Sequence, residues 1–230
     1  FLVLATQNPV EQEGTYPLPE AQIDRFLFKL LIDYPTPKEE QEILHQNVTL
    51  HKFEDYKISP IISKQKIIEM QQVVKNIYLK ENIRKYIVDI VNATRNPDTY
   101  KIKLGKYIEW GGSPRASIAL YIASKAEAVL NDATYVTPQF VKNVAGDVLR
   151  HRILMNYEGQ AEGISRNMIV EASPALSKPR AADLNISELA NEQGIYRPSA
   201  HLERAQARIE QLRGDLPQLV RDVRAGVESS

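Results

Sequence analysis

The feature that most constrains the fold is a pair of short apolar runs in the first 33 residues. The runs are Phe1–Ala5 (FLVLA) and Phe26–Ile32 (FLFKLLI), and both are short and apolar enough for buried strands. Runs without strict alternation are typical of parallel strands in a sheet that is covered on both faces. Ligands bind such sheets beyond the carboxyl ends of the strands, where Thr6, Gln7 and Asn8 follow the first run. We therefore predict that the chain begins inside an α/β domain, at an edge suited to chemistry.

The chain from Thr36 to Asn156 is predicted to be mainly helical. Thr36 is a suitable N-cap, Pro37 suits the first helical position and Glu39 completes a capping box, which predicts a helix to about Gln46. Apolar residues at helical spacing predict four further helices. These helices span Lys64–Leu79, Glu81–Asn96, Ser113–Asn131 and Thr137–Asn156. Together they predict an amphipathic bundle.

Two details of the bundle follow from the same spacing. The Ser113–Asn131 helix is expected to bury one particular set of side chains. That set is Ile118, Tyr121, Ile122, Ala126 and Val129. The stretch from Asn96 to Gly112 contains a turn signal and weak alternation, which predicts a short hairpin or an irregular connection. The paired glycines Gly111 and Gly112 either let the next helix approach a ligand or allow a tight turn.

Composition excludes several classes of function. Lys+Arg and Asp+Glu both count 29, so the net charge of +0 gives no general affinity for nucleic acid or anionic membranes. The chain has no cysteine, which excludes disulfides and thiolate chemistry, and none of its four histidines has the spacing of a metal site. No apolar run approaches the roughly 18 residues of a membrane span, and no basic residue precedes the apolar start. We expect a cytoplasmic protein without a bound metal of its own in this chain.

The composition of the chain changes near residue 171. Lysine is frequent up to Glu171 and occurs once after it, at Lys178, whereas seven arginines follow Glu171. Ala172–Arg180 is interpreted as a linker, and Ser187–Gln193 and Ser199–Arg213 are predicted helices, with a short third helix from Pro217. Residues 172–230 are thus predicted to be a helical tail, either diverged from the body or joined to it from another source, and we favour the second interpretation.

Three long segments of the chain, in order, resemble the MoxR family of AAA+ ATPases. They read LATQNPVEQEGTYPLPEAQIDRF from Leu4, YIEWGGSPRASIALYIASKAEA from Tyr107 and VTPQFVKNVAGDVLRHRILMNYEGQAEGI from Val136. The resemblance covers about residues 1–171. It implies that residues 1–35 are the end of the α/β P-loop core, with two parallel strands, and that residues 36–171 form the family's helical lid.

The resemblance also implies roles for three residues. Asn8 matches the sensor-1 asparagine that orients the attacking water, Arg25 matches the arginine finger and Arg115 matches the sensor-2 arginine of the lid. Each has a plainer alternative: Asn8 opens a turn, Arg25 pairs with Asp24 or Glu20, and Arg115 is a surface residue. The family usually has alanine at Gly112 and often tyrosine at Trp110, and neither change removes Arg115.

A basic cluster on the last predicted lid helix completes the candidates. Arg150, His151 and Arg152 are adjacent, and a surface or an interface explains them better than an anion site. No phosphate-cradling GxxxxGK[ST] motif and no strand ending in Asp-Glu occurs in the sequence. In the family both lie upstream of the residue numbered 1 here, so we expect the chain alone to be inactive.

The function that the resemblance implies is ATP hydrolysis with Mg²⁺ between the subunits of a hexameric ring. The resemblance couples this hydrolysis to remodelling or maturation of partner proteins. Proteins with von Willebrand A domains are the partners expected from the family. Two alternatives stay open. One is a magnesium-chelatase-type AAA+ subunit, which has the same finger and sensors, and the other is a non-catalytic helical scaffold that keeps the lid for contacts alone.

Overall fold

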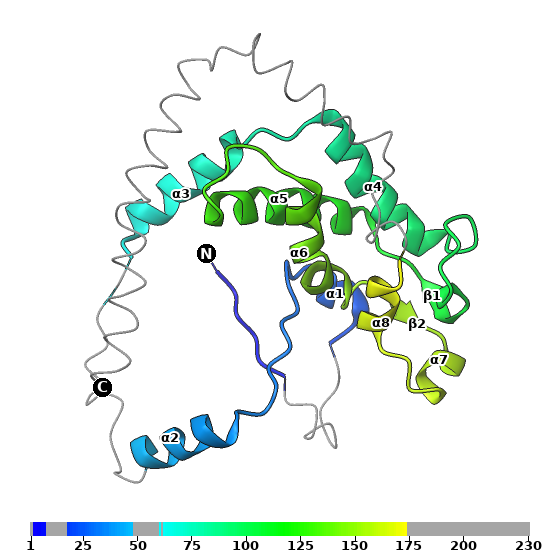
Figure 1. The fold of residues 1–230 in the computed structure, drawn as a ribbon, viewed down its shortest axis with the longest axis horizontal. Coiled ribbons are helices and arrows are strands. Elements are labelled where there is room, and N and C mark those ends of the chain that lie inside the picture. The colour runs from blue at the N-terminus through cyan, green and yellow to red at the C-terminus, as the bar shows by residue number, and fades with distance from the viewer. Residues whose placement is uncertain (1, 8–17, 48–59, 61, 174–230) are drawn as a thin grey trace.

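The computed structural model of the chain describes residues 2–7, 18–47, 60 and 62–173 (Figure 1). A bundle of helices surrounds α5 (Pro114–Leu130), which packs against α3 (Lys64–Asn76), α4 (Glu81–Arg95) and α6 (Pro138–Leu149). The other helices are short or peripheral. They are α1 (Glu20–Ile23), α2 (Pro37–Asn47), the 3₁₀ turn η2 (Gly105–Tyr107), α7 (Tyr157–Ala161) and α8 (Arg166–Glu171). The predicted helical bundle is confirmed.

Local capping explains where several of these helices begin. Thr36 and Glu39 form the predicted capping box: the Thr36 amide donates to Glu39 Oε2 at 2.8 Å and the Glu39 amide donates to Thr36 Oγ1 at 3.4 Å. Ser63 accepts the Lys66 amide before α3, and Ser113 accepts the Arg115 amide before α5, which has Pro114 at its first position. The predicted starts of these helices are therefore confirmed.

The core lies between α4, α5 and α6. One face of α4 is buried, and its members recur at helical spacing: Ile83, Tyr86, Ile87, Ile90, Val91 and Thr94. The predicted core face of α5 is wrong in part, because Ile118 and Ile122 are 58% and 44% exposed. The residues that α5 buries are Ala116, Ala119, Leu120, Ala123, Ser124, Lys125 and Ala128. Five of these seven are alanine or serine, so the buried face is mainly one of small side chains. Since α5 is contacted on several sides, small side chains let the neighbouring helices approach closely.

A two-stranded antiparallel sheet closes one end of the bundle. Strand β1 (Ile108–Trp110) pairs with β2 (Leu154–Met155), with Ile108 opposite Met155 and Trp110 opposite Leu154. The helix predicted over Thr137–Asn156 therefore ends early, at Leu149, because the residues after a short turn are needed in this sheet. The predicted irregular connection before α5 is confirmed, but its strand pairs with a distant segment rather than within a local hairpin.

The two parallel strands predicted at Phe1–Ala5 and Phe26–Ile32 do not form in the described residues. Residues 2–5 and 26–32 have no strand pairing there. A strand requires a partner for its backbone groups, and the lid takes several of those groups in the second segment. The Lys29 amide donates to the Asp147 carbonyl at 2.9 Å, and side chains from the turn after α6 bind the carbonyls of Phe26, Leu27 and Lys29.

The predicted helices of the tail and the linker beyond Ser173 lie outside the described residues, so they stay predictions, as does the division at residues 35 and 171. Within the described part, no helix has the length and apolar character needed to cross a membrane.

Candidate functional site

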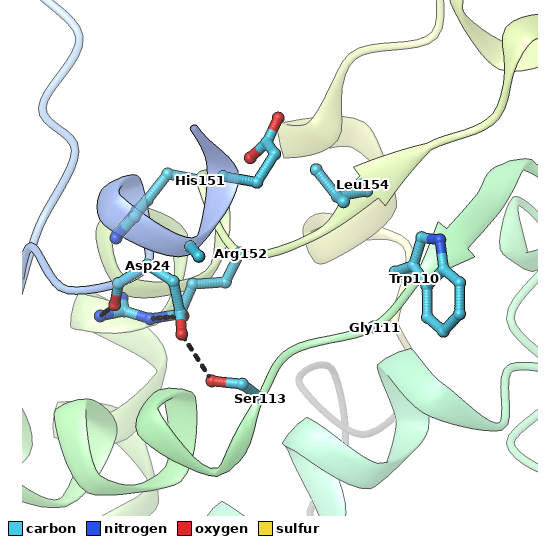
Figure 2. A pocket seen from close by; sticks show the side chains of 9 residues that line it. Asp24, Trp110, Gly111, Ser113, His151, Arg152 and Leu154 are labelled. Carbon is cyan, nitrogen blue, oxygen red and sulfur yellow. Dashed lines mark hydrogen bonds and ion pairs between the residues drawn. The ribbon is translucent and has the colours of Figure 1, made fainter. Parts of the chain in front are cut away.

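Asp24 is the point at which the first segment of the chain joins the lid. It lies directly after α1, and 19% of its side chain is exposed. One carboxylate oxygen, Oδ1, accepts from Arg152 Nε at 3.1 Å. The other, Oδ2, accepts from Ser113 Oγ at 2.9 Å (Figure 2). It also lies 3.6 Å from Arg115 Nη1. A single carboxylate therefore contacts both the start of α5 and the turn after α6.

The basic cluster after α6 binds the backbone of residues 24–29. Arg152, whose side chain is 3% exposed, donates to the carbonyls of Asp24 and Leu27, both at 3.1 Å, and to that of Phe26. Arg150 donates to the Lys29 carbonyl at 2.6 Å. His151 Nε2 lies 3.0 Å from the Phe26 carbonyl oxygen. The interface expected for these residues is therefore internal to the chain: they hold its first segment on the lid.

Burial lowers the pKa of two residues of this cluster, His151 and Arg152. Burial lowers the pKa of His151, and the positive charges of Arg152 and Lys29 act in the same direction, while the hydrogen bond to Phe26 and the Asp24 carboxylate oppose them. Neutral His151 donates to Phe26 through Nε2–H, which leaves its buried Nδ1 without a partner. Burial also lowers the pKa of Arg152, but a guanidinium stays protonated, and Asp24 balances its charge.

The loop before α5 is fixed by its packing on α4. The Gly112 amide donates to Thr94 Oγ1 at 2.9 Å, and Arg95 Nε donates to the Gly112 carbonyl at 2.7 Å. A Cβ atom on Gly111 would lie 2.5 Å from the backbone carbonyl of Thr94. The paired glycines therefore allow a close approach of two backbone segments. This approach sets the direction in which α5, with Ser113 and Arg115 in its first turn, leaves the loop.

We call the contacts of Asp24 with Ser113, Arg115 and Arg152 the junction. A pocket of about 170 Å³ lies between this loop and the junction. Asp24, Ser113, His151 and Arg152 contribute to one side of its lining, and Trp110, Gly111 and Leu154 lie across from them (Figure 2). Among residues 2–7, 18–47, 60 and 62–173 no three His, Cys, Asp or Glu side chains are grouped closely enough to hold a metal ion.

The structure brings two of the three predicted site residues near one another. Arg115 contacts Asp24, which immediately precedes Arg25 in the chain. Arg25 is exposed, and its guanidinium has no ion pair with Asp24, Glu20 or any other described residue. The local ion pair considered for Arg25 is therefore not present in the described part of the chain. Asn8 lies outside the described residues.

Two residues of the junction, Asp24 and Arg152, were not predicted as members of the site. Asp24 was considered only as a partner for Arg25, and Arg152 only as part of a basic cluster. The available signal was the adjacency of three basic residues on a predicted lid helix, since buried arginines require carboxylate or carbonyl partners. That signal does not say which segment of the chain supplies the partners.

Comparison with known proteins agrees with this architecture. The family described as "AAA lid domain" matches residues 105–173, and the family described as "ATPase family associated with various cellular activities (AAA)" matches residues 1–28. Chaperone MoxR1 of Mycobacterium tuberculosis is 40% identical over 172 residues, which are 74% of this chain and 44% of that protein. The uncharacterized protein YeaC of Bacillus subtilis is 43% identical over 170 residues, 74% of this chain and 50% of that protein.

A solved structure from Cytophaga hutchinsonii, described only as a candidate ATPase, has 44% sequence identity and a TM-score of 0.67. The similarity covers 74% of this chain and 52% of that one. The chain thus spans about half the length of the relatives it matches. The two family matches and the relatives agree with the three motifs in the sequence: over residues 1 to about 171, the chain belongs to the MoxR family of AAA+ ATPases.

Proposed function

We propose that the protein to which this chain belongs hydrolyses ATP between the subunits of a ring, with Arg25 acting on the nucleotide of the neighbouring subunit. The exposed, unpaired guanidinium of Arg25, on a backbone segment that the lid holds in place, is the observation that carries the proposal. A guanidinium free of local partners is available to the charge that develops on a transferred phosphoryl group.

Arg115 supports the same function from the lid. Its side chain is 51% exposed, and its contact with Asp24 at 3.6 Å is long for a charge-assisted hydrogen bond, so it can exchange this partner for a phosphate oxygen. In the proposed site Arg115 contacts the nucleotide of its own subunit, and Asn8 orients the attacking water. ATP, bound with Mg²⁺, supplies the phosphoryl group. Each exposed guanidinium group suits the negative charge of a nucleotide's phosphates, Arg115 in its own subunit and Arg25 in the neighbouring one.

In this proposal, ATP hydrolysis drives the remodelling or maturation of partner proteins in the cytoplasm. The relative named Chaperone MoxR1 supports a protein client. A ring of six subunits and partners with von Willebrand A domains complete the proposal, on the strength of the family resemblance.

The test uses the full-length ATPase and the substitution Arg25→Ala. We expect kcat to fall by roughly 10³–10⁵, as for other arginine fingers, with little change in nucleotide affinity. Arg84→Ala is the matched control, because Arg84 is an exposed arginine on α4 whose ion pair in the described residues is with Glu81, three residues away. Its kcat should stay within about twofold of wild type, since surface pairs of this kind contribute little.

Mixed assemblies test the neighbouring-subunit part of the proposal. Arg25→Ala subunits are mixed with subunits that keep Arg25 but carry a disabled phosphate-binding loop. Each type is inactive alone, and activity should reappear in the mixture, where an intact finger faces an intact nucleotide site. A mixture that stays inactive, although mixed rings are present by native mass spectrometry, would contradict action between subunits.

A further inference from the structure

All the N–H donors of the Arg152 guanidinium bind either the segment that carries Arg25 or the helix turn that precedes Arg152. Its Nε donates to Asp24 Oδ1, its Nη2 to the carbonyls of Asp24 and Phe26, and its Nη1 to those of Leu27 and Val148. These five bonds use all five N–H donors of an arginine. Buried and fully bonded, this side chain has one arrangement in which every donor is satisfied.

The bonds fall on both sides of Arg25. Arg152 binds the carbonyl of the residue before Arg25 and the carbonyl of the residue after it. The peptide group that joins Asp24 to Arg25 and the one that follows Phe26 are therefore held, while the side chain of Arg25 stays exposed. Such an arrangement fixes where the side chain starts and leaves its end free to reach a ligand.

From this geometry we propose that Arg152 is a positioning residue for Arg25: the lid, through Arg152, sets the place from which the finger reaches the neighbouring nucleotide. The inference rests on the proposed role of Arg25 and adds the element that controls it. Asp24 extends the connection, since its second carboxylate oxygen contacts Ser113 and Arg115 at the start of α5. A displacement of this end of the lid therefore moves the backbone of Arg25.

The consequence for the reaction is a loss of rate without a loss of nucleotide binding. A misplacement of about 1 Å in a catalytic group costs roughly 10²-fold in rate. Arg152 itself makes none of the phosphate contacts proposed for its own subunit. It is linked to one of them, Arg115, through Asp24, whose contact with Arg115 is long at 3.6 Å, so the KM for ATP should change much less than kcat. Lysine at this position has three donors on a single nitrogen in place of five on a planar fork, and cannot bind all five acceptors of Arg152.

The experiment is a double-mutant cycle in the full-length ATPase. Arg152→Lys and Arg152→Gln are measured alone and combined with Arg25→Ala. Alone, each should lower kcat by at least tenfold with KM within about twofold. Combined with Arg25→Ala, each should lower kcat by less than twofold further, because Arg152 acts through a side chain that is no longer there. Losses that multiply would overturn the proposal and assign Arg152 a general structural role.

The controls separate this inference from the proposed function. Arg84→Gln makes the same chemical change on an exposed face of α4 and should leave both constants unchanged. If Arg25→Ala itself leaves kcat unchanged, the proposed function fails. If Arg25→Ala is impaired while Arg152→Lys has wild-type kcat, only the present inference fails. Thermal unfolding identifies variants that do not fold. Should Arg152→Gln be one of these, Arg152→Lys, which keeps the buried charge, decides the outcome by itself.

Discussion

Gly111 lies where two backbone segments touch, at the loop before α5. A Cβ at this position would stand 2.5 Å from the carbonyl carbon and oxygen of Thr94 and 2.7 Å from the Arg95 amide nitrogen. Backbone atoms within α4 cannot move aside without breaking helix hydrogen bonds, so Gly111→Ala should destabilise the chain by about 1–3 kcal/mol. The free energy of unfolding in urea measures this change.

Gly146→Ala is the matched control for that substitution. Gly146 lies within α6, and a Cβ there meets only the end of the Arg150 side chain, at 3.3 Å. Because alanine favours a helix interior over glycine by about 0.5–1 kcal/mol, this variant should be as stable as wild type or more so. Equal stabilities for the two alanine variants would show that the close approach at Gly111 relaxes freely.

His151 gives the junction a dependence on pH. Its pKa in the folded chain is lowered by burial from the ordinary value of 6.5, so the folded state favours the neutral ring. Above about pH 6.5, protonation of His151 does not reduce the free energy of unfolding. Below that pH the free energy of unfolding declines, because the unfolded chain then binds a proton that the folded chain excludes. Unfolding in urea at pH 7.5, 6.5 and 5.5 should show this decline.

The substitution His151→Gln removes the titrating ring and keeps an N–H donor for the Phe26 carbonyl. It should weaken the dependence of stability on pH in that range, whereas His45→Gln, at an exposed position on α2, should keep the wild-type dependence. If all three proteins lose stability equally between pH 7.5 and 5.5, the neutral state assigned to His151 is wrong.

At the scale of the element, α5 shows how helix packing differs from what a single sequence suggests. Helical spacing selects Ile118 and Ile122 as core residues because they are large and apolar, yet both are exposed. The buried face is made mainly of alanines. Ala123→Leu should therefore destabilise the chain by about 1–3 kcal/mol through overpacking, measured as a fall in the free energy of unfolding.

Ile122→Ala provides the comparison on the opposite face of the same helix. Since Ile122 is 44% exposed, the change should cost no more than about 0.5 kcal/mol, as for an ordinary surface substitution. If Ile122→Ala lowers the free energy of unfolding more than Ala123→Leu does, the buried face predicted from the sequence is the right one.

At the scale of the whole molecule, what could be predicted was local in the chain. The capping box at Thr36, the Ser113-Pro114 start of α5 and the apolar face of α4 depend on residues within a few positions of one another. The junction does not: Arg152 and Asp24 are 128 residues apart. No spacing rule links such positions, which is why the cluster was predicted only as a surface or an interface, and its partner was not predicted.

The predicted strands failed for a related reason. Apolar composition selected Phe26–Ile32 as a buried strand, but Leu30, Leu31 and Ile32 are 65%, 58% and 93% exposed in the described structure. Whether such a segment forms a strand depends on the neighbour that pairs with it. In the described residues that neighbour is the lid, whose side chains bind carbonyl groups without continuing a sheet.

The shared carboxylate at Asp24 also restricts how a sequence of this kind can evolve. Loss of Asp24 leaves the buried charge of Arg152 without its counter-charge, and loss of Arg152 removes a donor from four carbonyls and a carboxylate. Each single step passes through a less stable protein, so the two positions should change together or not at all. Related chains that keep an arginine at position 152 are therefore expected to keep an acidic residue at position 24, immediately before the position of Arg25.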